Sequence, residues 1–245
     1  MIPKIFDRLF FFGPVSLGDT FVLSGAAHYF GDRCNELHFP CHEKFFETTS
    51  TLFQDYPNIK VVVMNGDIPT YLKEHGISRV LQNEIHMETI DGVSVIPMWD
   101  RQLYYGLDLP FSLRYTNFRL PKYVYGADHL YRSLSSGEPY VLVHKRTSDH
   151  PDGIPISITG FRESYNLPTD LKIIEITESI TSNMMQYVKL IEHATEIHCV
   201  SSSFFNLVDS MNNITNARLF FHDARATCRM SLHKRWTRVM YNNKC

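Results

Sequence analysis

The sequence predicts an α/β protein made of two Rossmann-like domains, and three observations lead to this prediction. Apolar runs of strand length alternate with segments of helical period, which is the pattern of βαβ units and a mainly parallel sheet. The alternation occurs twice, on either side of an aromatic and arginine-rich stretch at residues 98–134. A length of 245 residues is enough for two domains that each have a core. We therefore expect domains at residues 1–135 and 136–245.

In the first domain, strands are expected where apolar residues cluster in short runs, and helices where an apolar pattern of helical period follows a turn. A glycine and proline turn follows the first strand, and Gly76 closes the last helix. The expected strands cover residues 9–12, 36–39, 59–64, 80–82 and 93–96, and the expected helices cover residues 19–29, 43–54 and 68–74.

The second domain repeats this order after Ser133-Leu-Ser-Ser-Gly-Glu138, a run typical of a boundary. Thr227 to Lys244 carries basic residues around Trp236 and is expected to form a C-terminal basic helix. Its basic face is either solvated or contacts phosphate or a membrane surface, so peripheral membrane contact stays open. The expected strands cover residues 140–143, 156–159, 172–176, 196–200 and 217–221, and the expected helices cover residues 181–194 and 203–211.

The composition is that of a soluble globular protein, with 44% hydrophobic and 20% charged residues. The formal net charge of -2 gives no general attraction to nucleic acid. No stretch approaches the length of a membrane span, and the N-terminus lacks a signal-peptide cleavage pattern. We therefore expect neither a nucleic-acid partner nor a membrane span.

The five cysteines are odd in number and irregular in spacing, which fits a reducing compartment better than a disulfide framework. A cytoplasmic location is therefore expected. The only cluster that suggests zinc is Cys34-x3-His38-x2-Cys41-His42, which has no second half of known type and lies where a strand is expected. We expect no metal site.

The segment Pro139-Tyr-Val-Leu-Val-His144-Lys-Arg146-Thr-Ser-Asp149 joins an apolar strand to a dense group of polar and charged residues. In an open α/β sheet, ligands bind in the crevice beyond the carboxyl ends of the strands, so this strand end is a candidate site. A strand that ends in an ordinary solvated loop explains the pattern equally well.

Gly13-Pro-Val-Ser16-Leu-Gly18-Asp19-Thr20 joins the first expected strand to the first expected helix. A glycine here lets the backbone approach a ligand or a neighbouring segment closely. Asp19 or Thr20 is suited to cap the helix amides. Alternatively, the Asp19 carboxylate is a general base that removes a proton from an attacking hydroxyl.

Cys199-Val-Ser201-Ser202-Ser203-Phe-Phe205 places small polar residues at another strand-to-helix turn. Amides at a helix N-terminus, with hydroxyls beside them, bind phosphate, although a serine cluster is also a common N-cap. Together with His144 and Arg146, the serines indicate a diphosphate site in which arginine supplies a bidentate charge and no metal is needed.

Glu175 and Glu178 belong to the end of the strand expected at residues 172–176 and to the residues after it. A carboxylate at this place accepts hydrogen bonds from ribose hydroxyls, or else Glu178 only begins a helix. The P-loop, GxGxxG, HExxH and GxSxG motifs are all absent, which weakens the kinase, dehydrogenase, metalloprotease and hydrolase interpretations.

These motifs resemble those of a known enzyme group. Ser16-Leu-Gly18-Asp19-Thr-Phe-Val-Leu-Ser-Gly-Ala, followed by the strand Ile59-Lys-Val-Val-Val, resembles the first half of heptosyltransferase-type glycosyltransferases of the GT-B fold. His144-Lys-Arg146 resembles the His-x-Arg strand end of GT-B fucosyltransferases, and Ser202-Ser203-Phe204 resembles their serine-rich donor motif. The chain is short for a two-domain GT-B enzyme and lacks the Asp/Ser-Gly-Pro-x-His donor motif of heptosyltransferases.

The resemblance implies a compact GT-B enzyme with an acceptor-side N-terminal domain and a nucleotide-sugar-binding C-terminal domain. The implied reaction is the metal-independent transfer of a hexosyl or deoxyhexosyl unit from a nucleotide diphosphate sugar to a hydroxyl of a glycan acceptor. Asp19 is then the catalytic base, and Arg114 with the aromatic stretch belongs to the acceptor side, although such a stretch is more often packing and interdomain connection than binding surface. The implied donor-binding residues are Gly18, His144, Arg146, Glu178, Ser201, Ser202 and Ser203.

Two other functions are compatible with the same features. Polysaccharide pyruvyl transferases also have a Gly-Asp turn near the N-terminus on a similar double Rossmann architecture. A catalytically inactive nucleotide-binding protein of the same fold is the non-enzymatic alternative.

Overall fold

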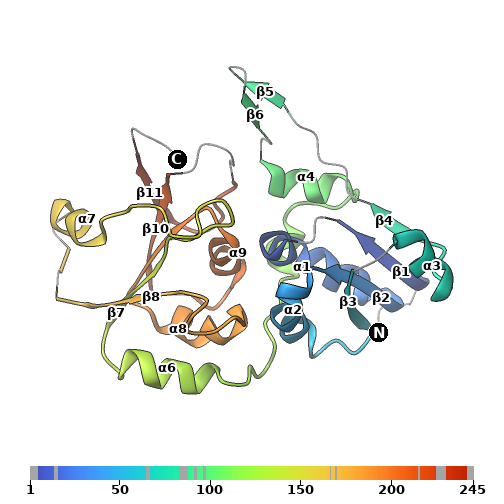
Figure 1. Ribbon diagram of the computed structural model, residues 1–245, viewed down its shortest axis with the longest axis horizontal. Coiled ribbons are helices and arrows are strands. Elements are labelled where there is room, and N and C mark those ends of the chain that lie inside the picture. The colour runs from blue at the N-terminus through green and yellow to red at the C-terminus, as the bar shows by residue number, and fades with distance from the viewer. Residues whose placement is uncertain are drawn as a thin grey trace. The chain divides into compact units, whose positions relative to one another are not determined.

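The computed structural model describes residues 5–13, 16–64, 67–82, 88–90, 93–95, 98–165, 167–168, 170–214, 216–224 and 230–241. The chain divides into two compact units, each built around a parallel sheet (Figure 1). Unit 1 comprises Met1–Tyr123 and Thr227–Ser231, and unit 2 comprises Val124–Ala226 and Leu232–Cys245.

The division falls between Tyr123 and Val124, whereas the sequence placed the boundary after residue 135. The helix between these two positions, α6 (Ala127–Ser135), belongs to unit 2. Its Tyr131 packs on His193, with ring centroids 4.8 Å apart.

Unit 1 contains a parallel sheet with the strand order β3-β2-β1-β4. The strands expected in this sheet are confirmed, since each apolar run pairs with its neighbour in register. The strand order reverses at β1, because β2 lies on one side of β1 and β4 lies on the other. Open α/β sheets bind ligands at such a switch point. The strands are β1 (Phe6–Phe12), β2 (Cys34–Cys41), β3 (Ile59–Val63) and β4 (Val80–Gln82).

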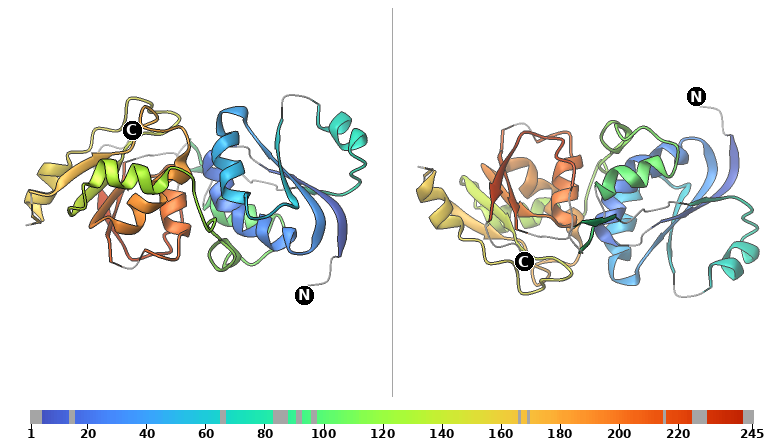
Figure 2. Two further views of the ribbon diagram at one scale, coloured as in Figure 1. Left: turned by 90° about the horizontal axis from the view of Figure 1, so that it is seen from below. Right: turned by 90° about the horizontal axis from the view of Figure 1, so that it is seen from above.

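Helices cover both faces of this sheet (Figures 1 and 2). Neighbouring side chains of β1 point to opposite faces. Phe11 packs against Phe30 of α1, with ring centroids 6.3 Å apart, and Phe10 packs against Tyr71 of α3 at 5.8 Å. The helices are α1 (Leu17–Gly31), the 3₁₀ helix η1 (Glu43–Phe45), α2 (Phe46–Phe53) and α3 (Ile68–Glu74).

The strand expected at residues 93–96 does not join the sheet. Its described part, β6 (Val93–Val95), pairs in antiparallel fashion with β5 (Glu88–Ile90) instead. Ile96 lies outside the described residues.

The aromatic stretch packs on α1 through α4 (Trp99–Tyr105) and α5 (Leu113–Thr116). The buried hydroxyl of Tyr104 donates to the Val22 carbonyl at 2.8 Å and accepts from the Ala26 amide at 3.2 Å. A Cβ atom at Gly25 would lie 2.2 Å from the Leu113 carbonyl oxygen, so only glycine permits this close approach of α5.

Arg114 is part of the core of unit 1, whereas the resemblance to GT-B enzymes implied a place on the acceptor side. Its side chain is 0% exposed, and its Nη1 donates to Asp100 Oδ2 at 2.6 Å. The same carboxylate accepts from the Ser231 amide at 3.2 Å and from the Ser231 hydroxyl at 3.3 Å. The expectation was wrong because burying an arginine requires a charged partner, and Asp100 supplies that partner here.

Unit 2 contains a parallel sheet with the strand order β11-β10-β9-β7-β8. Four of the strands predicted from apolar runs in the sequence are confirmed, and they form β7, β8, β9 and β10. Phe161 of α7 packs on Phe220, while Phe205 of α9 packs on the next residue, Phe221, so α7 and α9 lie on opposite faces. The strands are β7 (Tyr140–His144), β8 (Lys172–Glu175), β9 (Glu196–Val200), β10 (Arg218–Asp223) and β11 (Trp236–Met240). The further helices are α7 (Ile158–Ser164), the 3₁₀ helix η2 (Met184–Tyr187), α8 (Val188–His193) and α9 (Ser203–Ser210).

The prediction of a strand at residues 156–159 is wrong. Ser157 is the N-cap of α7, and its hydroxyl accepts a hydrogen bond from the Gly160 amide at 3.2 Å. Ile154, Ile156 and Ile158 all enter the core, so their alternation imitates a strand in the sequence. The helix begins within this segment because a capping serine stands inside the apolar run.

The prediction of a C-terminal basic helix is also wrong, because residues 236–240 form β11, an edge strand paired with β10. Buried Asp209 of α9 anchors the preceding segment. Its Oδ1 accepts from the amides of His233 and Lys234, each at 3.2 Å, and from Trp236 Nε1 at 2.8 Å. These tertiary hydrogen bonds favour an extended chain over the helix that the local composition suggested.

Buried polar side chains cross the α7 face of this sheet. His198 Nδ1 lies 2.9 Å from His222 Nε2, and His222 Nδ1 lies 2.7 Å from the Tyr241 hydroxyl. At the other end, His198 Nε2 lies 3.3 Å from Glu196 Oε2. The three bonds form one consistent chain when both histidines are neutral.

Buried histidines predict that stability falls in weak acid. Burial lowers the pKa of His28 and His144 to about 4 and that of His222 to about 3. Below pH 6.5 these residues bind protons in the unfolded chain but not in the folded chain. The free energy of unfolding therefore decreases as the pH is lowered. Each histidine contributes up to about 1.4 kcal/mol per pH unit between its unfolded and folded pKa.

Urea denaturation at several values between pH 7.5 and pH 5 measures this slope. We expect the His222→Gln variant to have a shallower slope than the wild type over the same range. A free energy of unfolding that is constant across this range would contradict the assignment of neutral buried histidines.

Candidate functional site

The candidate site lies at the carboxyl edge of the unit 2 sheet, where the strand order reverses. β8 lies on one side of β7 and β9 on the other, and all three strands are parallel. The gap between β7 and β9 is therefore the switch point at which such sheets bind ligands. His144 ends β7, and Ser201 to Ser203 follow β9.

His144 is held firmly by its neighbours at this edge. The residue is 8% exposed, and its ring stacks on Phe204 of α9, with centroids 5.2 Å apart and planes at 25°. Its Nδ1 lies 3.2 Å from the Ser202 hydroxyl. Burial, and then the charge of Arg146, lower the pKa of His144 to about 4, so the ring is neutral at pH 7.

The three predicted serines have different positions. Ser202 is the N-cap of α9, and its hydroxyl accepts from the Phe205 amide at 3.3 Å. Ser201 is buried, whereas Ser203 is the half-buried first residue of the helix. The structure thus brings Ser202 and His144 together. Ser202 also has the N-cap role that the sequence offered as an alternative to phosphate binding.

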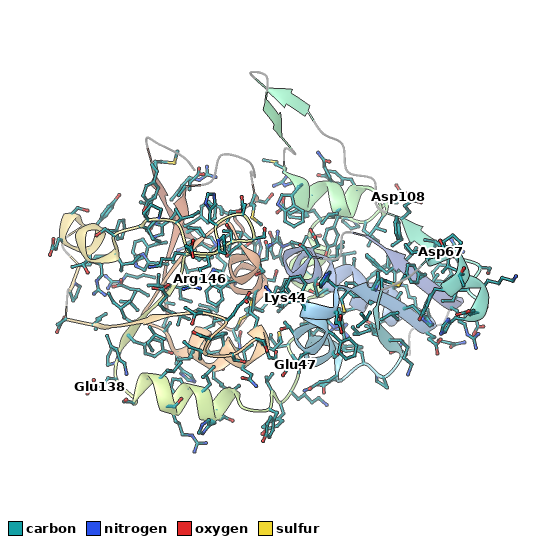
Figure 3. The ribbon with its side chains drawn as sticks, viewed as in Figure 1. Lys44, Glu47, Asp67, Asp108, Glu138 and Arg146 are labelled. Carbon is teal, nitrogen blue, oxygen red and sulfur yellow. The ribbon has the colours of Figure 1, made fainter. Side chains whose placement is uncertain are left out.

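Arg146 follows His144 on the segment after β7 and is labelled in Figure 3. Its side chain is 43% exposed, and its Nε lies 4.0 Å from Glu175 Oε1. The other oxygen of Glu175 pairs with Lys145 Nζ at 3.0 Å. A carboxylate at the end of β8 therefore lies between two cations at the same edge.

Glu178 lies in an exposed turn after β8, and no helix begins at this residue. The adjacent hydroxyls of Thr177 and Ser179 bond to each other at 2.7 Å, and Tyr187 donates to the Thr177 carbonyl at 3.0 Å. The turn is thus fixed at the carboxyl edge, with the Glu178 side chain at the surface.

Gly18 and Asp19 lie on unit 1, in the first turn of α1 beyond the carboxyl end of β1. Ser16 is the N-cap, and Asp19 is not, because Asp19 occupies the third helical position. The two residues form a capping box: Ser16 N donates to Asp19 Oδ2 at 3.2 Å, and Asp19 N donates to Ser16 Oγ at 3.4 Å.

Burial raises the pKa of Asp19 above its ordinary value, against the opposite effect of the hydrogen bonds with Ser16. The residue is 8% exposed. A raised pKa is the direction that makes a carboxylate a better proton acceptor near neutral pH. Structural capping and proton abstraction are thus both compatible with this position.

Two contacts of the site were not predicted from the sequence. The Phe204 ring that stacks on His144 belongs to the expected helix, but its direction depends on tertiary packing. The pairing of Glu175 with Lys145 gives Glu175 an ionic partner, whereas the sequence had grouped it with Glu178 as a ribose ligand. The sequence did contain a sign of this ion pair, because an acidic residue ends the strand that lies next to His144-Lys-Arg146.

The part of the chain that the structure describes contains no group of three or more His, Cys, Asp or Glu side chains arranged to hold a metal ion. Cys34, Cys41 and Cys199 are free thiols in the interior. None of the described helices is both long enough and apolar enough to cross a membrane.

No protein-family model matches the chain, and no curated protein sequence matches it. Solved structures do match. A family 9 glycosyltransferase from Veillonella parvula aligns with a TM-score of 0.62 at 7% identity, over 96% of this chain and 86% of that one. Heptosyltransferase II of Escherichia coli aligns with a TM-score of 0.52 at 12% identity, over 95% of this chain and 90% of that one.

TibC, an iron-containing dodecameric glycosyltransferase of enterotoxigenic E. coli, aligns with a TM-score of 0.57 at 13% identity. The match covers 99% of this chain and 67% of TibC. The structure of TibC with ADP-D-β-D-heptose aligns with a TM-score of 0.55 at 14% identity, and the chain covers 65% of it. This chain therefore spans about two thirds of the length of TibC.

At these identities the likeness concerns the fold. The matched structures are heptosyltransferases and family 9 glycosyltransferases of the GT-B fold. The chain accordingly has the α/β fold with two Rossmann-like domains that its sequence predicted.

Proposed function

We propose that the chain is a glycosyltransferase that moves a hexosyl or deoxyhexosyl unit from a nucleotide diphosphate sugar to a hydroxyl of a glycan acceptor. The observation that carries the proposal is the contact between His144 and Ser202 at the β7/β9 switch point, beside Arg146 and the N-terminus of α9. The fold shared with glycosyltransferases supports it, as does the ADP-heptose bound to TibC.

In this proposal the donor diphosphate binds at the carboxyl edge of unit 2. The Arg146 guanidinium and the α9 amides stabilise the negative charge that develops on the leaving diphosphate. His144 completes the proposed donor site at the end of β7, and Ser201 and Ser203 add polar donors. This charge supply makes the proposed reaction independent of a metal ion.

Glu178 orients the donor by accepting hydrogen bonds from the ribose hydroxyls. Its exposed place after β8, at the same edge as His144, supports this role.

Asp19 is the proposed base, and Gly18 keeps its turn free of side-chain bulk. The carboxylate removes the proton of the acceptor hydroxyl as the new glycosidic bond forms and the bond to the diphosphate breaks. Its raised pKa favours proton uptake. We further propose a cytoplasmic location, which the free buried thiols support.

Arg146→Ala is expected to weaken the binding of a nucleoside diphosphate about 10- to 100-fold, because a hydrogen bond to a charged group contributes about 1.5–3 kcal/mol. The fold is expected to survive, since the side chain is 43% exposed. Isothermal titration calorimetry with ADP, GDP and UDP measures the change. Exposed Arg132 of α6 supplies the matched control, Arg132→Ala, which should bind as the wild type does.

The reaction class is tested by product analysis with a panel of nucleotide sugars and, separately, with phosphoenolpyruvate. Transfer or slow hydrolysis of a nucleotide sugar supports the proposal. Consumption of phosphoenolpyruvate alone would replace it with a pyruvyl transferase. Nucleotide binding without turnover of any donor would replace it with an inactive nucleotide-binding protein.

A further inference from the structure

Glu175 ends β8 and lies between two cations at the carboxyl edge of the unit 2 sheet. Its Oε2 pairs with Lys145 Nζ at 3.0 Å, and its Oε1 lies 4.0 Å from Arg146 Nε. Glu175 is paired with Val143 in the ladder of β7 and β8, so it stands next to the end of β7, at the edge where the proposed donor site lies. A negative charge is therefore built into the edge that is proposed to bind a negatively charged ligand.

The loop after β7 holds Lys145 against Glu175. The Lys145 carbonyl accepts from the Ile154 amide at 2.8 Å, which closes residues 145–154 into a loop. The stem of the Lys145 side chain lies over Gly153, where a Cβ atom would be 3.0 Å from Lys145 Cγ. Gly153 has a φ of +94°, a conformation that also favours glycine. Lys145 is thus placed to pair with Glu175 by the conformation of its own loop.

Arg146 is bound to Glu175 less closely than Lys145 is. A separation of 4.0 Å is too long for a hydrogen bond, and Arg146 Nε has no hydrogen-bond partner among the residues that the structure describes. The guanidinium therefore keeps donors for a ligand, and the Glu175 carboxylate acts on that ligand through its charge. The three side chains together carry one net positive charge, because the carboxylate cancels one of the two cations.

We propose that Glu175 is a specificity-determining residue that weakens the binding of the released nucleoside diphosphate more than the binding of the nucleotide sugar. The inference rests on the proposed function, because it takes the ligands at this edge to be a sugar donor and its product. When the bond between the sugar and the diphosphate breaks, the electron pair stays on the diphosphate oxygen. The terminal phosphate thereby gains a second ionisation with a pKa of about 6, so the product is more negative than the donor at pH 7. The charge of Glu175 repels the product more strongly and so favours its release.

Isothermal titration calorimetry at pH 7.5 tests this with three ligand pairs: ADP and ADP-glucose, GDP and GDP-mannose, and UDP and UDP-glucose. Glu175→Gln keeps the shape of the side chain and removes its charge. We expect both members of the pair that binds best to bind this variant more tightly than the wild type. The gain should be about threefold larger for the nucleoside diphosphate, the effect of one further unit charge a few ångströms away in a water-like dielectric. Contacts of the sugar cancel, because each ligand is compared with itself.

Two further variants separate the charge of Glu175 from other effects. Glu175→Asp keeps the charge and is expected to keep the wild-type ratio of the two affinities. Glu192→Gln removes a carboxylate that pairs with Lys189 at 2.8 Å in the same unit. Glu192 belongs to α8, which leads into the amino end of β9 and so lies away from the carboxyl edge. This variant should also keep the wild-type ratio. The fold is expected to survive in Glu175→Gln, since the side chain is 34% exposed.

The outcomes distinguish this inference from the proposed function. Unchanged affinities in Glu175→Gln, or weaker binding of the nucleoside diphosphate, would overturn the role of Glu175 while the donor site stands. An equal change of the ratio in Glu192→Gln would overturn it too, because the effect would then belong to the charge of the whole unit. Failure of all six ligands to bind either the wild type or Glu175→Gln would overturn the proposed function, and this inference with it.

Discussion

Replacement of Asp19 by asparagine is expected to lower the rate of sugar transfer by about 10²- to 10⁴-fold, the range that a general base contributes. Asparagine has nearly the same shape and keeps an oxygen that accepts from the Ser16 amide, now bound to Asp19 Oδ2 at 3.2 Å. The capping box and the fold should therefore survive. Nucleoside diphosphate affinity should be unchanged, because the proposed donor site lies on unit 2.

The control for this variant is Asp67→Asn, which changes another N-terminal helix carboxylate of unit 1. Asp67 caps α3 through the Thr70 amide at 3.0 Å, and its side chain is labelled in Figure 3. We expect Asp67→Asn to transfer sugar at the wild-type rate. Initial rates at saturating donor measure both variants, and near wild-type transfer by Asp19→Asn would remove Asp19 from the role of base.

Arg114→Ala is expected to destabilise unit 1 by about 3–5 kcal/mol, the cost of leaving one partner of a buried ion pair without its counter-charge. Both side chains of the Arg114–Asp100 pair are 0% exposed, and burial already raises the pKa of Asp100. Without the guanidinium this carboxylate would retain only hydrogen-bond donors such as Ser231. Urea denaturation followed by circular dichroism measures the loss.

Arg119→Ala is the matched control, because Arg119 pairs with Asp32 at 3.0 Å but is 44% exposed. An exposed pair contributes about 0–1 kcal/mol, so this variant should be much closer to the wild type. Similar losses for the two variants would mean that burial does not govern the Arg114 pair.

The sequence predicted the central strands because their signal is local. Ile59–Val63 and Glu196–Val200 are short runs dominated by β-branched or apolar residues, and parallel strands covered on both faces need such runs. Trp236–Met240 was misread as helical, since three of the five residues of this edge strand, Arg238 among them, are exposed and it lacks that signal. Its extended form depends on Asp209, which no local pattern connects with it.

The candidate site shows the same division between local and tertiary information. Strand ends placed His144 and Ser202 correctly at one edge of the sheet, because parallel strands share the direction of their carboxyl ends. The assignment of Arg114 to a ligand surface failed, because its partner Asp100 belongs to a different helix. Side-chain pairs of this kind follow from packing, which the order of residue types does not specify.

The central claim is that unit 2 binds the diphosphate of a nucleotide donor at the β7/β9 switch point. A thermal-shift titration of the full chain with ADP, GDP, UDP, CMP and dTDP tests it most directly. A ligand at 100 times its dissociation constant adds about 2.7 kcal/mol to the stability of the native state. We expect one nucleoside diphosphate to raise the melting temperature of the wild type, and to raise that of Arg146→Ala much less. No shift with any of the five nucleotides, or equal shifts for both proteins, would contradict the account.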